Sequence, residues 1–172
     1  MFIRLLKRWL TKAQNWDGLR NILAPKLLVS HTSQLLPNAT LRPKTHIAQV
    51  DYAKVNNAKF VDLPAEKYIE MMSDPLFLGD PLIVSQHLIG ATKWEKISDE
   101  EVVSHHQSRA AHQRWADEQR SAVAVKGHGH GVVTTFYKKL DGVWKWAGIR
   151  TKVIWNEYDF EHVFIGKAGK DV

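Results

Sequence analysis

The sequence contains no cysteine among its 172 residues. This absence excludes disulfide bonds, cysteine-based zinc sites and a thiol nucleophile, and it fits a protein of a reducing compartment. Long apolar runs are also lacking: no stretch is long enough for a membrane span or for the hydrophobic region of a secretory signal. We therefore expect a cytoplasmic, intracellular protein with no membrane span, and we keep association with vesicles as an alternative.

Acidic residues are scarce in the first part of the chain. Residues 1–26 carry a net charge of +5 and residues 27–49 one of +2, so the remainder sums to −1 although the whole chain carries +6. A nucleic-acid-binding protein normally carries its basic residues as a patch on the folded body. Here that body is close to neutral, and we expect no nucleic-acid partner.

Apolar residues at helical spacing predict the first elements. They indicate an amphipathic basic helix over residues 2–13, which we expect to pack on the domain, with a presequence or membrane-surface helix as the alternative. A second helix is predicted over residues 16–24, and a third begins near Pro64 with Asp62 as the candidate N-cap.

Beyond Gly79-Asp80-Pro81 the hydrophobic period shifts toward two. This alternation predicts strands over residues 83–96, 101–115, 121–139 and 143–155, with a turn at Asp141-Gly142. Helices followed by a four-stranded antiparallel meander predict the α+β class. With 44% hydrophobic residues, the chain is expected to form a single domain over residues 1–172.

Residues 29–49 follow neither the helical nor the strand period. They include Pro37 and Pro43 and no acidic residue. The pattern predicts a loop, and a loop of this length is uncommon inside a compact domain. The segment is therefore either a functional lid or foreign to the fold.

Six of the nine histidines lie between residues 87 and 130, so a metal site must be considered. His128 and His130 share one face of a predicted strand and could chelate as a pair. No carboxylate accompanies them in that strand, so we expect no metal there but a structural or subunit-contact role, with zinc or iron as the alternative. Of the adjacent His105 and His106, only one can face inward without a bulge.

His87 and His112 differ from the other histidines because apolar and aromatic residues surround them in the sequence. A buried imidazole requires hydrogen-bond partners or a ligand, and histidine ionises close to neutral pH. Two such rings converging on one cavity could move protons. The alternative is a pair of core histidines.

Several short sequence motifs, taken in their order along the chain, resemble those of a known family. They are Gly79-Asp80-Pro81, Gln86-His87-x-Ile89-Gly90, Trp94-Glu95-Lys96, His112-Gln113-Arg114, Lys126-Gly127-His128, Tyr137 to Lys145, and Trp155 to Phe160. Together they resemble fungal scytalone dehydratase and its relatives in polyketide gene clusters, over about residues 50–164 and 16–25. The resemblance implies a cone-shaped α+β fold of the nuclear-transport-factor-2-like (NTF2-like) type, a homotrimer and no cofactor.

The same resemblance implies a dehydratase, a lyase that removes water from a β-hydroxy ketone of an aromatic polyketide in melanin-like or anthraquinone-like biosynthesis. It places the acid/base pair on His87 and His112 and a carbonyl-polarising tyrosine on Tyr52. The apolar walls of the substrate site then fall on Val55, Met71, Phe77, Phe160 and Phe164.

Some family positions are occupied here by other residue types. The family's tyrosine-aspartate pair corresponds to Thr11-Lys12, so a second tyrosine and the carboxylate that orients His112 are missing. Its serine beside the other histidine falls on Gly131, and its substrate-binding asparagine falls on Val133. A non-catalytic or ligand-binding protein of the same fold, or a polyketide isomerase or cyclase, is therefore the alternative.

Deletion of residues 29–49 would join Leu28 to Val50 and restore the family's spacing between its second helix and Tyr52. We hypothesise that this segment is a translated intervening sequence, and that residues 1–13 are likewise an artefact of the gene model.

Overall fold

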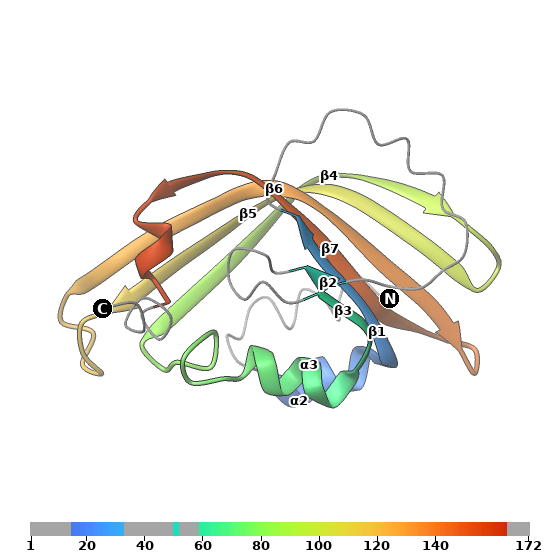
Figure 1. Cartoon of the computed structure of the whole chain (residues 1–172), viewed down its shortest axis with the longest axis horizontal. Coiled ribbons are helices and arrows are strands. Elements are labelled where there is room, and N and C mark those ends of the chain that lie inside the picture. Colours follow the sequence, from blue (N-terminus) through green and yellow to red (C-terminus); the bar gives the residue numbers. More distant parts are fainter. Residues whose placement is uncertain (1–14, 33–49, 52–58, 165–172) are drawn as a thin grey trace.

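The computed structural model describes residues 15–32, 50–51 and 59–164. Its elements are α2 (Trp16–Ile22), β1 (Leu23–Thr32), β2 (Val50–Asp51), β3 (Lys59–Pro64), α3 (Ala65–Met72), β4 (Ile83–Lys96), β5 (Glu101–Trp115), β6 (Val123–Leu140), β7 (Val143–Tyr158) and the 3-10 helix η1 (Phe160–His162). A seven-stranded sheet in the order β2-β3-β1-β7-β6-β5-β4 arches over α2 and α3 (Figure 1). The predicted α+β cone is confirmed. Within these ranges no helix is long and apolar enough to cross a membrane.

The four strands of the predicted meander are β4 to β7, and each pairs antiparallel with the next. Leu140 pairs with Val143 across a two-residue turn. Asp141 and Gly142 in that turn have φ angles of 50° and 77°. Two positive φ values define the hairpin turn that matches the twist of the strands, and Asp-Gly is among its preferred sequences. The turn predicted at these two residues is confirmed.

The predictions for residues 16–32 were only partly right. The helix ends at Ile22 rather than Ala24, and β1 continues to Thr32, into the segment predicted as a loop. β1 lies parallel to β7 and antiparallel to β3. Its pairing with β7 is interrupted between Leu23 and Leu28, the interval that contains Pro25, a residue with no N–H to donate. Hydrogen bonds to strands distant in sequence therefore form β1 despite its irregular pattern.

The predicted cap of α3 is wrong. The N-cap is Pro64 and no side chain caps this helix, whereas Asp62 lies in β3 with a φ angle of 54°. The strand β3 was not predicted at all. The predictions for residues 2–13 lie outside the described residues, as do those for residues 33–49.

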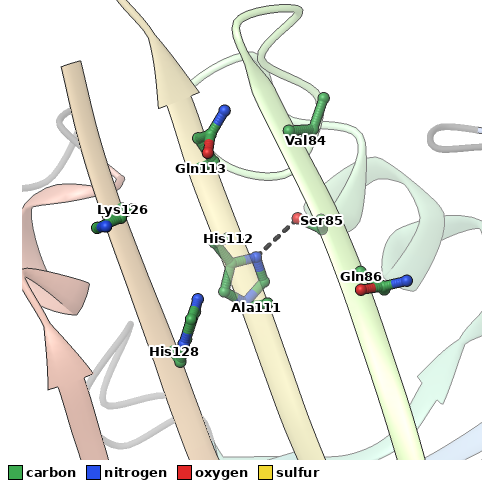
Figure 2. A pocket seen from close by; sticks show the side chains of 8 residues that line it. All are labelled: Val84, Ser85, Gln86, Ala111, His112, Gln113, Lys126 and His128. Atoms are coloured by element: carbon green, nitrogen blue, oxygen red, sulfur yellow. Dashed lines mark hydrogen bonds between the residues drawn. The ribbon is translucent and has the colours of Figure 1, made fainter. Parts of the chain in front are cut away.

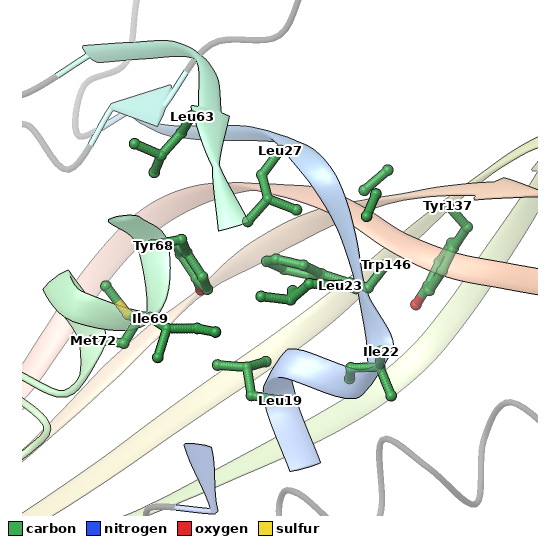
Figure 3. Packing of buried hydrophobic residues seen from close by; sticks show 12 residues of the cluster. Leu19, Ile22, Leu23, Leu27, Leu63, Tyr68, Ile69, Met72, Tyr137 and Trp146 are labelled. Atoms are coloured by element: carbon green, nitrogen blue, oxygen red, sulfur yellow. The ribbon is translucent and has the colours of Figure 1, made fainter. Parts of the chain in front are cut away.

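The main hydrophobic core lies between the two helices and the concave face of the sheet (Figure 3). The rings of Tyr68 on α3 and Trp146 on β7 contact each other with centroids 5.4 Å apart. Leu27 on β1 is fully buried between them and Leu63 on β3. The core comprises Leu19, Ile22, Leu23, Ala24, Leu27, Leu63, Tyr68, Ile69, Met72, Tyr137, Trp146 and Ala147.

Strand alternation gives β4, β5 and β6 an inner face, toward the helices, and an outer face. His106 is buried on the inner face. Its neighbour His105 points outward, where its Nδ1 lies 3.1 Å from the Thr134 hydroxyl. The prediction that only one of this pair faces inward is confirmed.

Candidate active site

The inner face of β4 and β5 brings His87 and His112 together. Ser85 lies opposite His112 in the register of the two strands, and His87 lies opposite Ala110. Because alternate residues share a face, all three polar side chains point to the same side of the sheet. The two imidazole rings meet edge to face with their centroids 5.6 Å apart.

His112 is held by a hydroxyl that the sequence did not suggest. Its Nδ1 lies 2.7 Å from Ser85 Oγ (Figure 2). The missing carboxylate at Lys12 had led to the expectation that His112 has no orienting partner, and Ser85 corrects this. A hydrogen bond at Nδ1 fixes the orientation of the ring and leaves Nε2 for other contacts. Only the cross-strand register identifies Ser85, because it lies 27 residues from His112 in the sequence.

Burial determines the charge state of this pair. His112 is only 6% exposed. Burial, with smaller contributions from His87 and His128, lowers the pKa of His112 to about 3. Burial also lowers the pKa of His87 below its usual value. Both rings are therefore neutral at pH 7, and each offers one N–H and one lone pair.

His87 has an unused nitrogen. Its Nε2 is buried and has no hydrogen-bond partner among the residues that the structure describes. A buried polar atom without a partner costs about 1–3 kcal/mol, so such atoms are rare unless a ligand or water occupies the site. This nitrogen is therefore able to bind a ligand or a water molecule.

Aromatic rings of the C-terminal segment cover His112. The ring centroids of Phe160 and Phe164 lie 5.6 and 5.1 Å from that of His112. Phe77, in the turn region after α3, contacts Phe164 with centroids 5.0 Å apart. A Cβ at Gly127 would lie 2.2 Å from Phe160 Cα, so this glycine lets the segment rest directly on β6.

Arg114 anchors the same segment. Its Nε donates to the carbonyl oxygen of Val163 at 2.8 Å, and its Nη2 forms an ion pair with Asp80 Oδ2 at 2.7 Å. Both charged side chains are largely buried. Arg114 therefore joins the turn before β4, strand β5 and the aromatic cover of His112.

The remaining predicted substrate contacts are more scattered. Met71 on α3 is half-buried against the main core. Val133 is buried on the inner face of β6. It lies four residues from Gly129, which is level with His87 in the strand register, and four residues of a strand span about 13 Å. Tyr52 and Val55 lie outside the described residues, as does Thr11-Lys12.

Gly131 has no room for the serine of the family. A Cβ there would lie 2.2 Å from the carbonyl oxygen of Lys152 on β7. The sheet is locally irregular at this point, because the register of β6 and β7 shifts between His130 and Gly131. The glycine is thus a requirement of the backbone packing in this chain.

The pocket in Figure 2 lies on the other side of the sheet from the aromatic cover. Its volume is about 210 Å³. Most of its lining residues alternate with Ser85 and His112 along their strands, and therefore belong to the outer face. They are Val84, Gln86, Ala111, Gln113, Lys126 and His128, with Ser85 and His112 behind them.

Comparisons with known proteins agree with this arrangement. The family model of scytalone dehydratase matches residues 40–172. The scytalone dehydratase arp1 of Aspergillus fumigatus is 47% identical over 152 residues, which are 88% of this chain and 78% of that protein. The chain belongs to the scytalone dehydratase family.

Solved structures support the fold of this scytalone dehydratase family member. The Kfla4162 protein of Kribbella flavida superposes with a TM-score of 0.66 at 14% identity, covering 95% of this chain and 93% of that one. An NTF2-like protein of Pseudomonas putida superposes with a TM-score of 0.53 at 12% identity, covering 88% and 82%. The NTF2-like fold expected from the sequence is confirmed.

Proposed function

We propose that this member of the scytalone dehydratase family is a hydro-lyase. Its substrate would be a β-hydroxy ketone of an aromatic polyketide in fungal pigment or secondary-metabolite biosynthesis. The observation that carries the proposal is the pair of neutral imidazoles, His112 and the half-buried His87, the first oriented by Ser85 and the second with a buried, unpartnered Nε2. The relatives that are named scytalone dehydratases support the same reaction class.

Water loss from a β-hydroxy ketone needs one base and one acid. The base takes the proton from the carbon next to the carbonyl, and the electrons of that C–H bond form an enolate. The enolate then collapses to an enone as the β-hydroxyl leaves with a proton from the acid. Two neutral imidazoles can do both, because the lone pair of one accepts and the N–H of the other donates. Transfer of the accepted proton from the first ring to the second then returns both rings to the neutral state.

The direction of the hydrogen bond between Ser85 and His112 would decide which histidine is the acid and which is the base. If its hydroxyl donates to His112 Nδ1, His112 Nε2 carries the proton and acts as the acid. If the hydroxyl accepts from Nδ1, His112 Nε2 is the base. In either case His87 Nε2 supplies the complementary step, and its buried position strengthens contacts to developing charge.

The substrate site would be apolar and flat. Phe160 and Phe164 cover His112. We propose that Tyr52 polarises the carbonyl and that Val55, Met71, Phe77 and Val133 complete the walls. Aromatic side chains around a few polar groups are typical of sites for planar phenolic ligands. The proposed reaction needs no cofactor. We also propose that residues 1–172 form one domain and that the protein acts in the cytoplasm.

Assembly into a homotrimer is proposed from the family, and the outer face offers an apolar surface for it. Ile154 and Trp155 on β7 are 61% and 49% exposed, and Leu88 on β4 is 49% exposed. Contiguous exposed apolar side chains of this kind mark contacts between proteins. Sedimentation of the purified protein should give three chains, and Ile154→Asp should shift the species toward one chain.

The decisive experiment incubates the purified protein with scytalone and with hydroxylated tetralone and anthrone analogues. Dehydration is followed by product absorbance and mass. His87→Ala and His112→Ala should each lower the rate by at least about 100-fold, the range of general acid/base catalysis. His162→Ala, an exposed histidine paired with Asp159, should leave the rate unchanged.

The alternative is a ligand-binding protein without catalysis. It is favoured by Gly131, Val133 and Lys12, which stand where the family has a serine, an asparagine and an aspartate. Tight binding of the analogues with no water loss, unaffected by the two active-site substitutions, would replace the dehydratase with this alternative. Isomerised or cyclised product without loss of mass would instead identify an isomerase or cyclase.

A further inference from the structure

A cluster of three potential ligands lies on the outer face of the sheet. His128 and His130 are two residues apart on β6, and Glu157 lies opposite His128 on β7. Glu157 Oε2 is 3.1 Å from His128 Nδ1 and 3.1 Å from His130 Nε2. One ligand atom from each residue lies within 4.8 Å of the other two. The strand of the two histidines contains no carboxylate, and Glu157 reaches them from the neighbouring strand, a pairing that the sequence pattern alone does not show.

The two imidazole rings are held in place before any ligand binds. His130 stacks on Trp155 with ring centroids 3.7 Å apart and planes 5° from parallel. The ring of His128 meets Tyr158 edge to face at 5.0 Å. The side chains of His128, His130 and Glu157 are 17%, 21% and 35% exposed. The cluster is thus partly desolvated and, in the single chain, still open to ions from solution.

The polar contacts of this cluster cannot all be satisfied at once. Arg109 Nη2 lies 2.6 Å from His128 Nδ1, and arginine can only donate. If His128 Nδ1 accepts from Arg109, it has no proton for Glu157 Oε2, so two lone pairs face each other across 3.1 Å. The Nε of Arg109 is also buried with no partner among the described residues. A cation bound to both lone pairs would remove this conflict.

The ligand types and spacing suit a particular class of cation. Imidazole nitrogens and carboxylate oxygens bind Zn²⁺ at about 2.0–2.2 Å, which places neighbouring ligand atoms of a tetrahedron about 3.3 Å apart. The observed separations of 3.1 Å are close to that value. Mg²⁺ and Ca²⁺ prefer oxygen ligands, whereas two imidazoles favour zinc and its transition-metal neighbours.

We propose that His128, His130 and Glu157 form a binding site for a divalent transition-metal ion of the zinc class. Arg109 is the internal cation that the metal displaces: its guanidinium now lies 3.7 Å from Glu157 Oε2 and must move away. The bound ion would connect β6 to β7 on the face opposite the His87 and His112 pair. The proposal does not depend on the dehydratase function, because its readout is metal binding.

The test titrates the metal-free full-length protein with Co²⁺, follows the visible absorption of the bound ion, and then displaces it with Zn²⁺. We expect one Co²⁺ per chain, and His130→Ala and Glu157→Gln should each weaken binding at least about 10-fold. Arg109→Gln should strengthen binding because it removes the competing cation. His162→Ala is the matched control and should bind as the wild type does.

Two results would overturn the proposal. One is the absence of stoichiometric Co²⁺ or Zn²⁺ binding in the wild type. The other is binding that Glu157→Gln and His130→Ala leave unchanged while both variants keep the wild-type circular dichroism, since this would mean an adventitious ion on other histidines. Weaker binding in Arg109→Gln would overturn the role assigned to the guanidinium.

Discussion

At the scale of single residues, Ser85 occupies the place beside His112 for which the family resemblance implies a carboxylate partner. Its hydroxyl contacts His112 Nδ1 at 2.7 Å, so His112 keeps a defined ring orientation. A hydroxyl is uncharged and does not stabilise an imidazolium as a carboxylate does. In the proposed reaction, proton transfer would therefore start and end with neutral rings, which agrees with the low pKa of about 3 for His112.

Removal of this hydroxyl should affect the rate more than binding. We expect Ser85→Ala to lower kcat about 10–100-fold with little change in KM, because supporting partners of a reactive imidazole have effects of that size. Ser85→Thr retains the hydroxyl and should recover most of the loss. Ser104→Ala removes a buried serine of β5 from the same inner face of the sheet and serves as the control in steady-state kinetics. Equal losses in both alanine variants would assign Ser85 a purely structural role.

The neutral state of His112 also affects stability. In the unfolded chain its pKa is near the usual 6.5, whereas in the fold it is about 3. As pH falls from about 6.5 toward 3, His112 is protonated in the unfolded state but not in the folded state. The contribution of neutral His112 to stability is therefore present above pH 6.5 and is lost progressively below it. The slope approaches about 1.4 kcal/mol per pH unit. Urea unfolding between pH 7.5 and 4.5 should show this slope, reduced in His112→Gln, and an unchanged slope in that variant would contradict the assignment.

At the scale of elements, strands with local partners were predictable and strands with distant partners were not. The alternation of β4 to β7 and the Asp141-Gly142 turn predicted four strands whose ends agree within a few residues. β1 and β3 depend on pairings such as Leu27 with Leu63 and Leu28 with Gly148, which no local pattern encodes. The site follows the same rule: His87 and His112 were visible as unusual residues, while Ser85 and Glu157 emerge only from cross-strand register.

The anchoring of the C-terminal segment gives a prediction at this scale. Arg114→Met removes the donor to the Val163 carbonyl and the ion-pair partner of Asp80. Loss of one member of a buried ion pair costs about 3–5 kcal/mol, and we expect a free energy of unfolding lower by about 3 kcal/mol in urea titrations. Dehydration should also slow, since Phe160 and Phe164 lose their anchor. Arg20→Ala breaks exposed ion pairs and should cost under about 1 kcal/mol, so equal losses would contradict this account.

At the scale of the whole molecule, the sheet separates two kinds of chemistry. The inner face carries neutral histidines under an aromatic cover, and the outer face carries the charged cluster of Arg109, Glu157 and their histidine neighbours. The strands β5 and β6 contribute to both faces because their side chains alternate. Substitutions on one face should therefore leave the other face intact, which makes the catalytic and metal-binding tests independent of each other.

The register of the sheet gives a prediction for residues 29–49 as a translated intervening sequence. Val29 on β1 and Val50 on β2 both pair with Phe60 of β3, from its two sides. After deletion, Val50 would follow Leu28 and take the register position of Val29. Tyr52 would then take the register position of His31, which pairs with Thr151 of β7. Thr151 in turn pairs with Val133, a residue of the inner face of β6.

We therefore expect the protein without residues 29–49 to fold and to dehydrate the substrate at least about 10-fold faster, because a tyrosine at that position can polarise the carbonyl through hydrogen bonding. Unfolding and kinetics of the deleted protein, with Tyr52→Phe in the same background as the control, test this directly. Sequencing of the mature transcript gives an independent answer. A tryptic peptide from within residues 29–49 in the native protein, or a deleted protein that does not fold, would contradict the hypothesis, since the segment would then be a genuine part of the sheet.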